Sequence, residues 1–210
     1  MSTDFQSEQG DNKEFALKEE MLNEFEYIFN PGSVAVIGAS HKDNYSLSMV
    51  RTKMKENLFL VNPKRENLFG KECYDSILDI TEGIDYVVIS VPAPLVPEVL
   101  RECIEKEAKV AHIFSSGFSE TGIAERIELE NEVKEIAKGR IRLIGPNCMG
   151  IYCPKSGLSF NPGASSEGGA VGVISQSGTF ADLLSDIGRI RNIKFSKAIS
   201  YGNAIDLDCP

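Results

Sequence analysis

Short runs of consecutive apolar residues alternate with amphipathic stretches along most of this 210-residue sequence. The strongest run is IDYVVISV at 84–91, far below the ~20 apolar residues that a membrane-spanning helix needs. Runs of this length are typical of strands buried on both faces, and the helical spacing between them indicates crossover helices. The sequence therefore predicts an α/β fold with a parallel sheet that is covered by helices on both faces.

The expected elements follow the chain in a regular order. The strands are expected at 33–38, 58–61, 84–91, 110–114 and 141–144, and the helices between them at 44–56, 95–106 and 123–138. Beyond residue 145 glycine becomes frequent, and one more strand–helix–strand unit is expected at 170–175, 179–189 and 195–201. Two strands and one helix cannot cover both faces of a sheet. This unit either extends the first sheet or begins a second domain, and we favour the second interpretation.

The first 28 residues differ from the rest in charge. They carry eight acidic and two basic side chains, in a chain whose net charge is −9. Residues 1–12 are expected to form a tail, and apolar residues at helical spacing predict an amphipathic helix over 13–29. An acidic chain without a basic stripe argues against nucleic acid and anionic membrane as partners.

Cysteine usage and the polar start of the chain both bear on its compartment. The five cysteines are odd in number and form no CxxC pair, which favours reduced thiols over disulfides or a metal site. The first residues, MSTDFQSEQGDN, resemble neither a signal peptide nor a transit peptide. A cytoplasmic location is expected.

The residues that follow the strands are the most informative about a ligand, because open α/β sheets bind ligands beyond the carboxyl ends of their strands. The loop 38–43 has one glycine, whereas the dinucleotide fingerprint has three. Lys64 and Arg65 follow the second strand, where an NAD site needs a carboxylate. These cations favour a nucleotide with an extra ribose phosphate, as in NADP or coenzyme A (CoA), although a solvated turn explains them equally well.

Two prolines follow the third expected strand in Val91-Pro92-Ala93-Pro94. Proline has a fixed φ and no N–H group, so this loop presents a stiff apolar surface. Such a surface around Pro92 suits an adenine ring or a pantetheine arm. The simpler interpretation is that the prolines begin the next helix.

Five motifs occur in order along the chain: NPGSVAVIGAS, VPAP, IGPNCMG, GGAVGVISQSGTF and SYGNAIDLD. Together they resemble the CoA-binding subunit of succinyl-CoA synthetase and the related NDP-forming acyl-CoA synthetases, and the resemblance spans residues 29–210. It implies a Rossmann-like CoA-binding domain at 29–145 and the first part of a flavodoxin-like ligase domain at 146–210. The acidic tail and short helix at 1–28 precede them.

The resemblance implies that CoA is held by the loops at the strand ends. By matching position, and together with the apolar surface at Pro92, the implied binding residues are Ser40, His41, Lys42, Asp43, Lys64, Arg65, Pro92, Phe114, Ser115 and Ser116. The first of these loops continues as HKDNYSLSM and lacks the glycine and proline that are usual in the family. Cys148 matches a family cysteine near the CoA thiol, but a merely buried thiol is the simpler interpretation.

A phosphate-binding helix start is implied at Ser175, Ser177 and Gly178. Free N–H groups, two hydroxyls and the helix dipole would converge there on one anion. An ordinary N-cap accounts for Ser177 but not for Ser175. In the family, acyl-CoA is converted to an acyl phosphate, and the phosphoryl group passes to a histidine and then to ADP or GDP. Neither His41 nor His112 matches that histidine, so no catalytic residue is expected in this chain.

The implied function is therefore the CoA-binding portion of an acid–CoA ligase. Its partners would be CoA, a small carboxylic acid, and an ATP-grasp domain or beta subunit that carries ATP or ADP with Mg²⁺, in an oligomer. Two alternatives stay open. One is a non-catalytic module that senses CoA or acyl-CoA, and the other is an NADP-binding redox domain.

Overall fold

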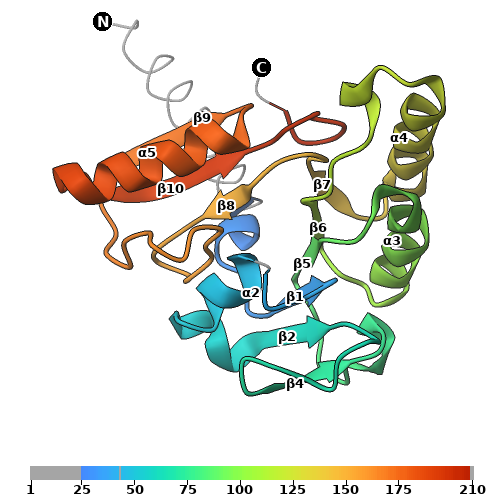
Figure 1. Ribbon diagram of the computed structural model, residues 1–210, viewed down its shortest axis with the longest axis horizontal. Coiled ribbons are helices and arrows are strands. Elements are labelled where there is room, and N and C mark those ends of the chain that lie inside the picture. The colour runs from blue at the N-terminus through green and yellow to red at the C-terminus, as the bar shows by residue number, and fades with distance from the viewer. Residues whose placement is uncertain (1–24, 43, 209–210) are drawn as a thin grey trace, which may run out of the picture.

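The computed structural model describes residues 25–42 and 44–208, which form two sheets. The larger sheet has seven strands in the order β3-β4-β2-β1-β5-β6-β7, and the smaller has three in the order β8-β10-β9 (Figure 1). The separate second sheet agrees with the interpretation that the last strand–helix–strand unit does not extend the first sheet. The expected helix over 13–29 lies outside the described residues except for its last turn, where residues 25–29 are helical.

The strands of the larger sheet agree closely with the runs of apolar residues. They are β1 (Val34–Ile37), β2 (Leu58–Val61), β3 (Asn67–Leu68), β4 (Lys71–Tyr74), β5 (Tyr86–Ile89), β6 (Val110–Ile113) and β7 (Arg142–Ile144). All neighbouring pairs are parallel except β3 with β4, a short hairpin that the apolar pattern did not predict. The helices that follow β5 and β6 are α3 (Val96–Glu105) and α4 (Ala124–Ala137), as expected.

The crossover after β1 is broken into two pieces. The sequence predicts one helix over 44–56, but the structure has α2 (Asn44–Met49) followed by a separate 3-10 helix, η1 (Lys53–Asn57). Thr52 causes the break, because its extended backbone leaves the helix and its hydroxyl accepts a hydrogen bond from the Met54 N–H. A side chain that caps a new helix in this way competes with continuation of the old one.

The two faces of the larger sheet are covered differently. Residues such as Ala35 and Val87 point into one core with α3 and α4, which lie together on one side of the sheet in Figure 1. Their neighbours Val36 and Val88 point into the other core, where α2 meets the second unit through residues such as Phe160. Helices therefore cover both faces as expected, but on this second face the short α2 and η1 share the cover with the following unit.

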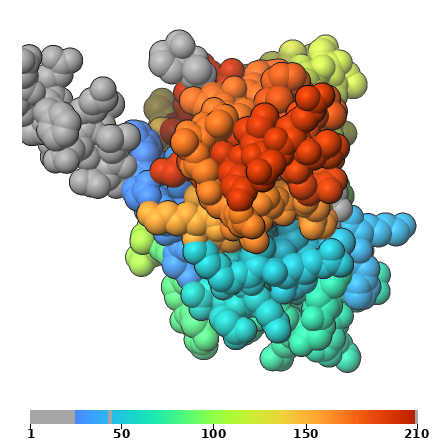
Figure 2. Space-filling model, turned by 90° about the vertical axis from the view of Figure 1, so that its left-hand side faces the viewer, coloured from blue at the N-terminus to red at the C-terminus, as the bar shows by residue number. Residues whose placement is uncertain are grey.

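The second unit consists of β8 (Gly150–Tyr152), β9 (Val171–Ser175), α5 (Gly178–Arg191) and β10 (Phe195–Ser200). Strand β10 lies in the middle, antiparallel to β8 and parallel to β9. Strand β9 is at the edge of this sheet, and apolar side chains stay exposed on it and on α5, with Ile174 66% and Ile190 71% exposed. Figure 2 shows this unit seated directly on the residues around α2 and η1.

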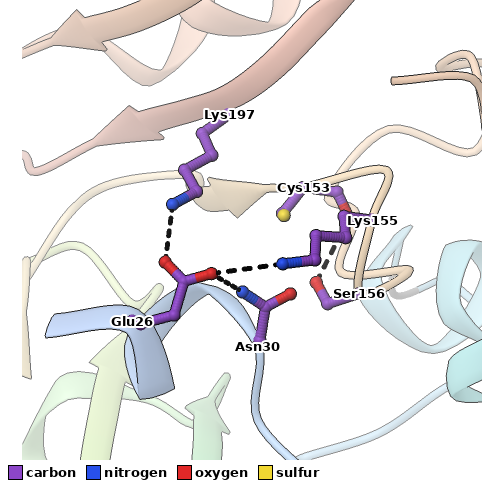
Figure 3. A network of polar contacts seen from close by, with 6 residues as sticks. All are labelled: Glu26, Asn30, Cys153, Lys155, Ser156 and Lys197. Carbon is purple, nitrogen blue, oxygen red and sulfur yellow. Dashed lines mark hydrogen bonds and ion pairs between the residues drawn. The ribbon is translucent and has the colours of Figure 1, made fainter. Parts of the chain in front are cut away.

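The helical turn at 25–29 is fastened to the second unit by a network of polar contacts (Figure 3). The Glu26 carboxylate accepts from Lys197 Nζ of β10 at 2.8 Å and lies 3.5 Å from Lys155 Nζ. Asn30 donates to the same carboxylate. The hydrogen bond from Lys197 outweighs the effect of burial and lowers the pKa of Glu26. Since Lys197 also lies 4.5 Å from the centre of the Phe29 ring, this contact combines charge with a cation–π interaction.

Candidate functional site

A pocket of about 440 Å³ opens where the carboxyl ends of β5, β6 and β7 meet the start of α5. This is the edge of a parallel sheet at which ligands bind. The predicted residues Pro92, Phe114, Ser115, Ser116 and Gly178 come together here. The full lining comprises Ser90, Val91, Pro92, Phe114, Ser115, Ser116, Asn147, Cys148, Met149, Gly178 and Thr179.

Ser115 joins the loops that form this pocket. Its hydroxyl donates to the backbone carbonyl of Val91, and its own carbonyl accepts from the Asn147 N–H at 3.0 Å. The side chain is half-buried, whereas Pro92 and Ser116 are exposed. Ser115 therefore holds the three loops in register, and the groups free to face a ligand are its neighbours.

The apolar part of the wall comes from the loops after β5 and β6. The Phe114 ring is 36% exposed and packs edge-on against Tyr45 of α2, with ring centres 5.5 Å apart. Pro92 adds a rigid apolar surface beside it, as its position in the sequence predicts. This wall suits an uncharged, flexible arm better than a phosphate group.

The loop after β7 places Cys148 and Met149 at the pocket. His112 of β6 contacts the backbone of this loop. The His112 imidazole is fully buried, and its Nε2 lies 3.1 Å from the Cys148 carbonyl oxygen. Burial lowers the pKa of His112 to about 4, so the ring is neutral near pH 7 and donates through Nε2. Gly150 leaves room for the ring, because a Cβ there would lie 2.4 Å from His112 Cε1. His112 is therefore a buried histidine of the core.

Cys148 itself is a poor nucleophile in this setting. Its side chain is 4% exposed, and burial raises the pKa of its thiol to about 12. The thiol is therefore protonated at neutral pH, and reactivity of cysteine depends on the thiolate. The structure confirms the interpretation of Cys148 as a buried thiol.

The start of α5 supplies the polar end of the pocket. Ser177 is the N-cap, and its hydroxyl accepts from the Phe180 N–H at 3.3 Å. Ser175 accepts from the Ser177 N–H at 3.1 Å, so both predicted hydroxyls stabilise the turn itself. Gly178 packs so tightly on Met149 that an added Cβ would lie 2.6 Å from Met149 Cγ. This close approach brings the positive end of the helix dipole to the pocket, which favours an anion.

The other predicted residues form a second group at the ends of β1 and β2. Gly38 has φ +87°, and a Cβ there would lie 2.3 Å from the Ser90 carbonyl oxygen, so this turn requires glycine. The Asn62 amide donates to the Ala39 carbonyl at 2.7 Å and its oxygen accepts from the Lys64 N–H at 2.9 Å. These bonds hold the turn that carries Lys64 against the first loop.

The side chains on these two turns are open to solvent. The exposed side chains are His41, Lys42, Lys64 and Arg65. The ion pairs of the described residues include neither of these lysines nor this arginine. The His41 ring stacks edge-on against Phe69, with ring centres 5.2 Å apart. Asp43 lies outside the described residues. Contacts of these residues, and of Ser40, with a ligand stay a prediction.

Sequence reasoning missed several residues of the pocket. Asn147, Met149 and Thr179 line it, although only the motifs IGPNCMG and GGAVGVISQSGTF, read as family signatures, pointed to their segments. A third motif segment contacts the loop after β7, although it does not line the pocket. Within SYGNAIDLD, the Asn203 N–H donates to the Pro146 carbonyl at 2.9 Å, and its amide donates to Glu120 at 2.7 Å.

The sequence matches the family described as CoA binding domain over residues 32–154, which is more than half of the chain. The chain belongs to the CoA-binding domain family. A second match, to the succinyl-CoA ligase like flavodoxin domain, covers residues 168–210 and thus all of β9, α5 and β10. Both matches confirm the resemblance drawn from the five motifs.

Relatives of this member of the CoA-binding domain family are considerably longer. An ADP-forming acetate–CoA ligase of Methanocaldococcus jannaschii is 44% identical over 194 residues, which cover 88% of this chain and 26% of the relative. The alpha subunit of ADP-forming acetate–CoA ligase II of Pyrococcus furiosus is 38% identical, with 87% and 41% covered. The chain therefore spans about a quarter to two fifths of the curated relatives that it matches.

A solved structure supports the same fold. Acetyl-coenzyme A synthetase 1 of Ca. Korarchaeum cryptofilum, in complex with phosphate and ADP, superposes with a TM-score of 0.80 at 32% identity. The superposition covers 88% of this chain and 40% of that one. None of the helices in the described part of this chain is long and apolar enough to cross a membrane.

Proposed function

We propose that this chain is the CoA-binding portion of an NDP-forming acid–CoA ligase, with the thiol end of CoA in the 440 Å³ pocket. The observation that carries the proposal is that Gly178 and Thr179, at the start of α5, line the same pocket as the loops after β5, β6 and β7. A thiol that enters along the apolar wall would meet an anion held at the helix start. Acyl transfer between a thiol and an acyl phosphate needs this juxtaposition.

The chemistry assigns a task to each end of the pocket. In acyl transfer the CoA sulfur attacks the acyl carbonyl carbon, a C–S bond forms, and the bond from carbon to the phosphate oxygen breaks. The thiol proton passes to the phosphate, which leaves as an anion. Backbone N–H groups at the start of α5 would stabilise that anion. Phe114 and Pro92 would hold the pantetheine arm, and Cys148, with its raised pKa, would take no covalent part.

The phosphorylated end of CoA belongs at the second group of residues. Lys64 and Arg65 are exposed cations on the turn that Asn62 ties to the first loop. Their charge suits the 3′-phosphate of CoA, and His41 and Lys42 on the adjoining loop suit its adenosine and pyrophosphate. The histidine that carries the phosphoryl group would come from sequence outside these 210 residues, since neither His41 nor His112 lines the pocket.

The remaining components would come from outside the chain. An ATP-grasp domain or a beta subunit would hold ATP or ADP with Mg²⁺, and the carboxylic acid would bind between that part and α5. The name of the Pyrococcus furiosus relative, an alpha subunit, favours such a division of tasks. The acid–CoA ligase would work in the cytoplasm as part of an oligomer.

Comparison of CoA with dephospho-CoA tests this placement. Dephospho-CoA should bind more weakly by about 1.5–3 kcal/mol, because it lacks the charged group that would face Lys64. The Lys64→Ala variant should remove most of this difference, whereas Lys134→Ala, which removes an exposed lysine of α4, should leave it intact. Isothermal titration calorimetry measures each affinity. Equal affinities in the unsubstituted chain would contradict the placement of the 3′-phosphate.

A further inference from the structure

A second pocket lies at the seam between the two units, apart from the site described above. It measures about 460 Å³ and is enclosed by the end of α2 and the start of η1 on one side and by the loop 152–166 on the other. It shares no lining residue with the 440 Å³ pocket. In Figure 2 the same seam is visible where the second unit meets the residues around η1.

The walls of this seam pocket carry positive charge. Arg51 and Lys53 line it, and none of its lining residues in the described part of the chain is an aspartate or glutamate. Asp182 and Asp186 on α5 accept hydrogen bonds from the Asn161 amide, a lining residue, at 2.8 and 3.2 Å. Asn161 thus stands between those carboxylates and the pocket. In a chain of net charge −9, this concavity favours an anion.

The pocket also offers hydroxyl groups, one of which lacks a partner. Ser48 contributes to the wall and is 2% exposed, yet its Oγ has no hydrogen-bond partner among the described residues. Buried hydroxyls are normally paired, and an unpaired one is unfavourable. Ser165 and Ser166 add two further hydroxyls to the opposite wall. A ligand rich in hydrogen-bond acceptors would give the Ser48 hydroxyl the partner that it lacks among the described residues.

The two walls are fixed against each other by a close contact. The Thr52 hydroxyl donates to the Gly157 carbonyl at 2.9 Å, across the seam. Gly157 has φ +84°, and a Cβ there would lie 2.9 Å from Thr52 Oγ1 and 3.1 Å from Lys53 Cγ. Arg51 and Lys53 flank this anchored threonine on both sides in sequence. Their backbone positions are therefore set before a ligand arrives, which lowers the entropic cost of binding.

We propose that the seam pocket binds a small phosphate monoester, with its phosphate between Arg51 and Lys53. Arginine and lysine together match a group of nearly two negative charges, and the hydroxyls match its several acceptor oxygens. A phosphate ion alone would fill only part of 460 Å³, so the pocket has room for a small organic body. Because the walls belong to different units, a bound ligand would also hold the units together. The proposal is independent of the function proposed above.

The test is calorimetric titration of the chain, at constant ionic strength, with glycerol 3-phosphate, inorganic phosphate and glycerol. Titrations are repeated in the Ser177→Ala variant, which removes the N-cap hydroxyl of α5 and so alters any anion site there. Glycerol 3-phosphate should bind in both backgrounds and glycerol in neither. Tighter binding of inorganic phosphate than of glycerol 3-phosphate would identify a site for the free ion and contradict the monoester assignment.

Variants assign the binding to the seam pocket. Arg51→Gln and Lys53→Gln should each weaken binding of glycerol 3-phosphate at least fivefold, with an unchanged melting temperature because both side chains are exposed. Lys55→Gln is the matched control, since Lys55 is an exposed lysine of η1 that does not line the pocket. An equal loss in Lys55→Gln would show general attraction of anions. Absence of binding, or loss in Ser177→Ala alone, would also overturn the proposal.

Discussion

Replacing His112 by glutamine should remove a pH dependence from the stability of the protein. The imidazole is fully buried, and burial lowers its pKa from the ordinary 6.5 to about 4, although the contact with the Cys148 carbonyl opposes part of this effect. Between these two pKa values the unfolded chain binds a proton that the folded chain does not. The contribution of His112 to stability is therefore fully present above pH 6.5 and is lost as the pH falls toward 4.

The size of the effect follows from the two pKa values. A difference of about 2.5 pKa units corresponds to roughly 3.4 kcal/mol when titration is complete, and to about 2 kcal/mol between pH 7 and pH 5. Urea denaturation at these two pH values, for the unsubstituted chain and for His112→Gln, isolates this term because all other groups are shared. The glutamine amide keeps a donor for the Cys148 carbonyl but takes up no proton in this range.

The predicted outcome is a change in ranking with pH. His112→Gln should have the lower free energy of unfolding at pH 7, because it leaves a smaller side chain against Gly150. At pH 5 the difference between the two proteins should have shifted by about 2 kcal/mol in favour of His112→Gln. A difference between the two proteins that is the same at both pH values would refute the reasoning. It would mean that the imidazole takes up its proton equally easily in the folded and unfolded chains.

Two further substitutions test the way in which the units meet. Gly178→Ala should lower the free energy of unfolding by about 1–3 kcal/mol and weaken CoA binding, because the new Cβ would press on Met149. Gly172→Ala on β9, where a Cβ meets nothing within 4 Å, should do neither, and equal effects of the two variants would contradict the packing argument. Glu26→Gln should cost less than about 1 kcal/mol, since the carboxylate is 40% exposed, and the cost should shrink at high salt. A cost that does not depend on salt in denaturation experiments would mean that charge is not what fastens the 25–29 turn.

Strands β1, β2, β5, β6 and β7 of the larger sheet could be predicted from the sequence because each lies in an apolar run. Strand β5 is buried along its whole length, so its pattern needs no knowledge of its neighbours. The short hairpin of β3 and β4 gives no such signal, since residues such as Asn67 and Glu72 are exposed. Strand β8 was missed because three apolar residues can be read equally well as a loop. Tertiary pairing with β10 decides that case.

The site was only partly predictable, for a different physical reason. The rule for the ends of parallel strands pointed to the loop at Pro92 because it depends on topology alone, and Phe114 was implied only by the family resemblance. That Met149 lies against Gly178 depends on how the second unit packs on the first, which no periodicity encodes. The role of Ser115 was also out of reach. Whether its hydroxyl faces a ligand or a neighbouring loop depends on the distance between two loops in space.

Titration of CoA into this chain, followed by calorimetry, tests the central claim most directly. The strand-end loops to which CoA is assigned all lie within the described structure apart from Asp43, so the chain should bind CoA by itself. We expect about one site per chain and an affinity in the micromolar range, near −8 kcal/mol. NADP should not displace the bound CoA. Failure to bind CoA, or preferential binding of NADP, would contradict the account.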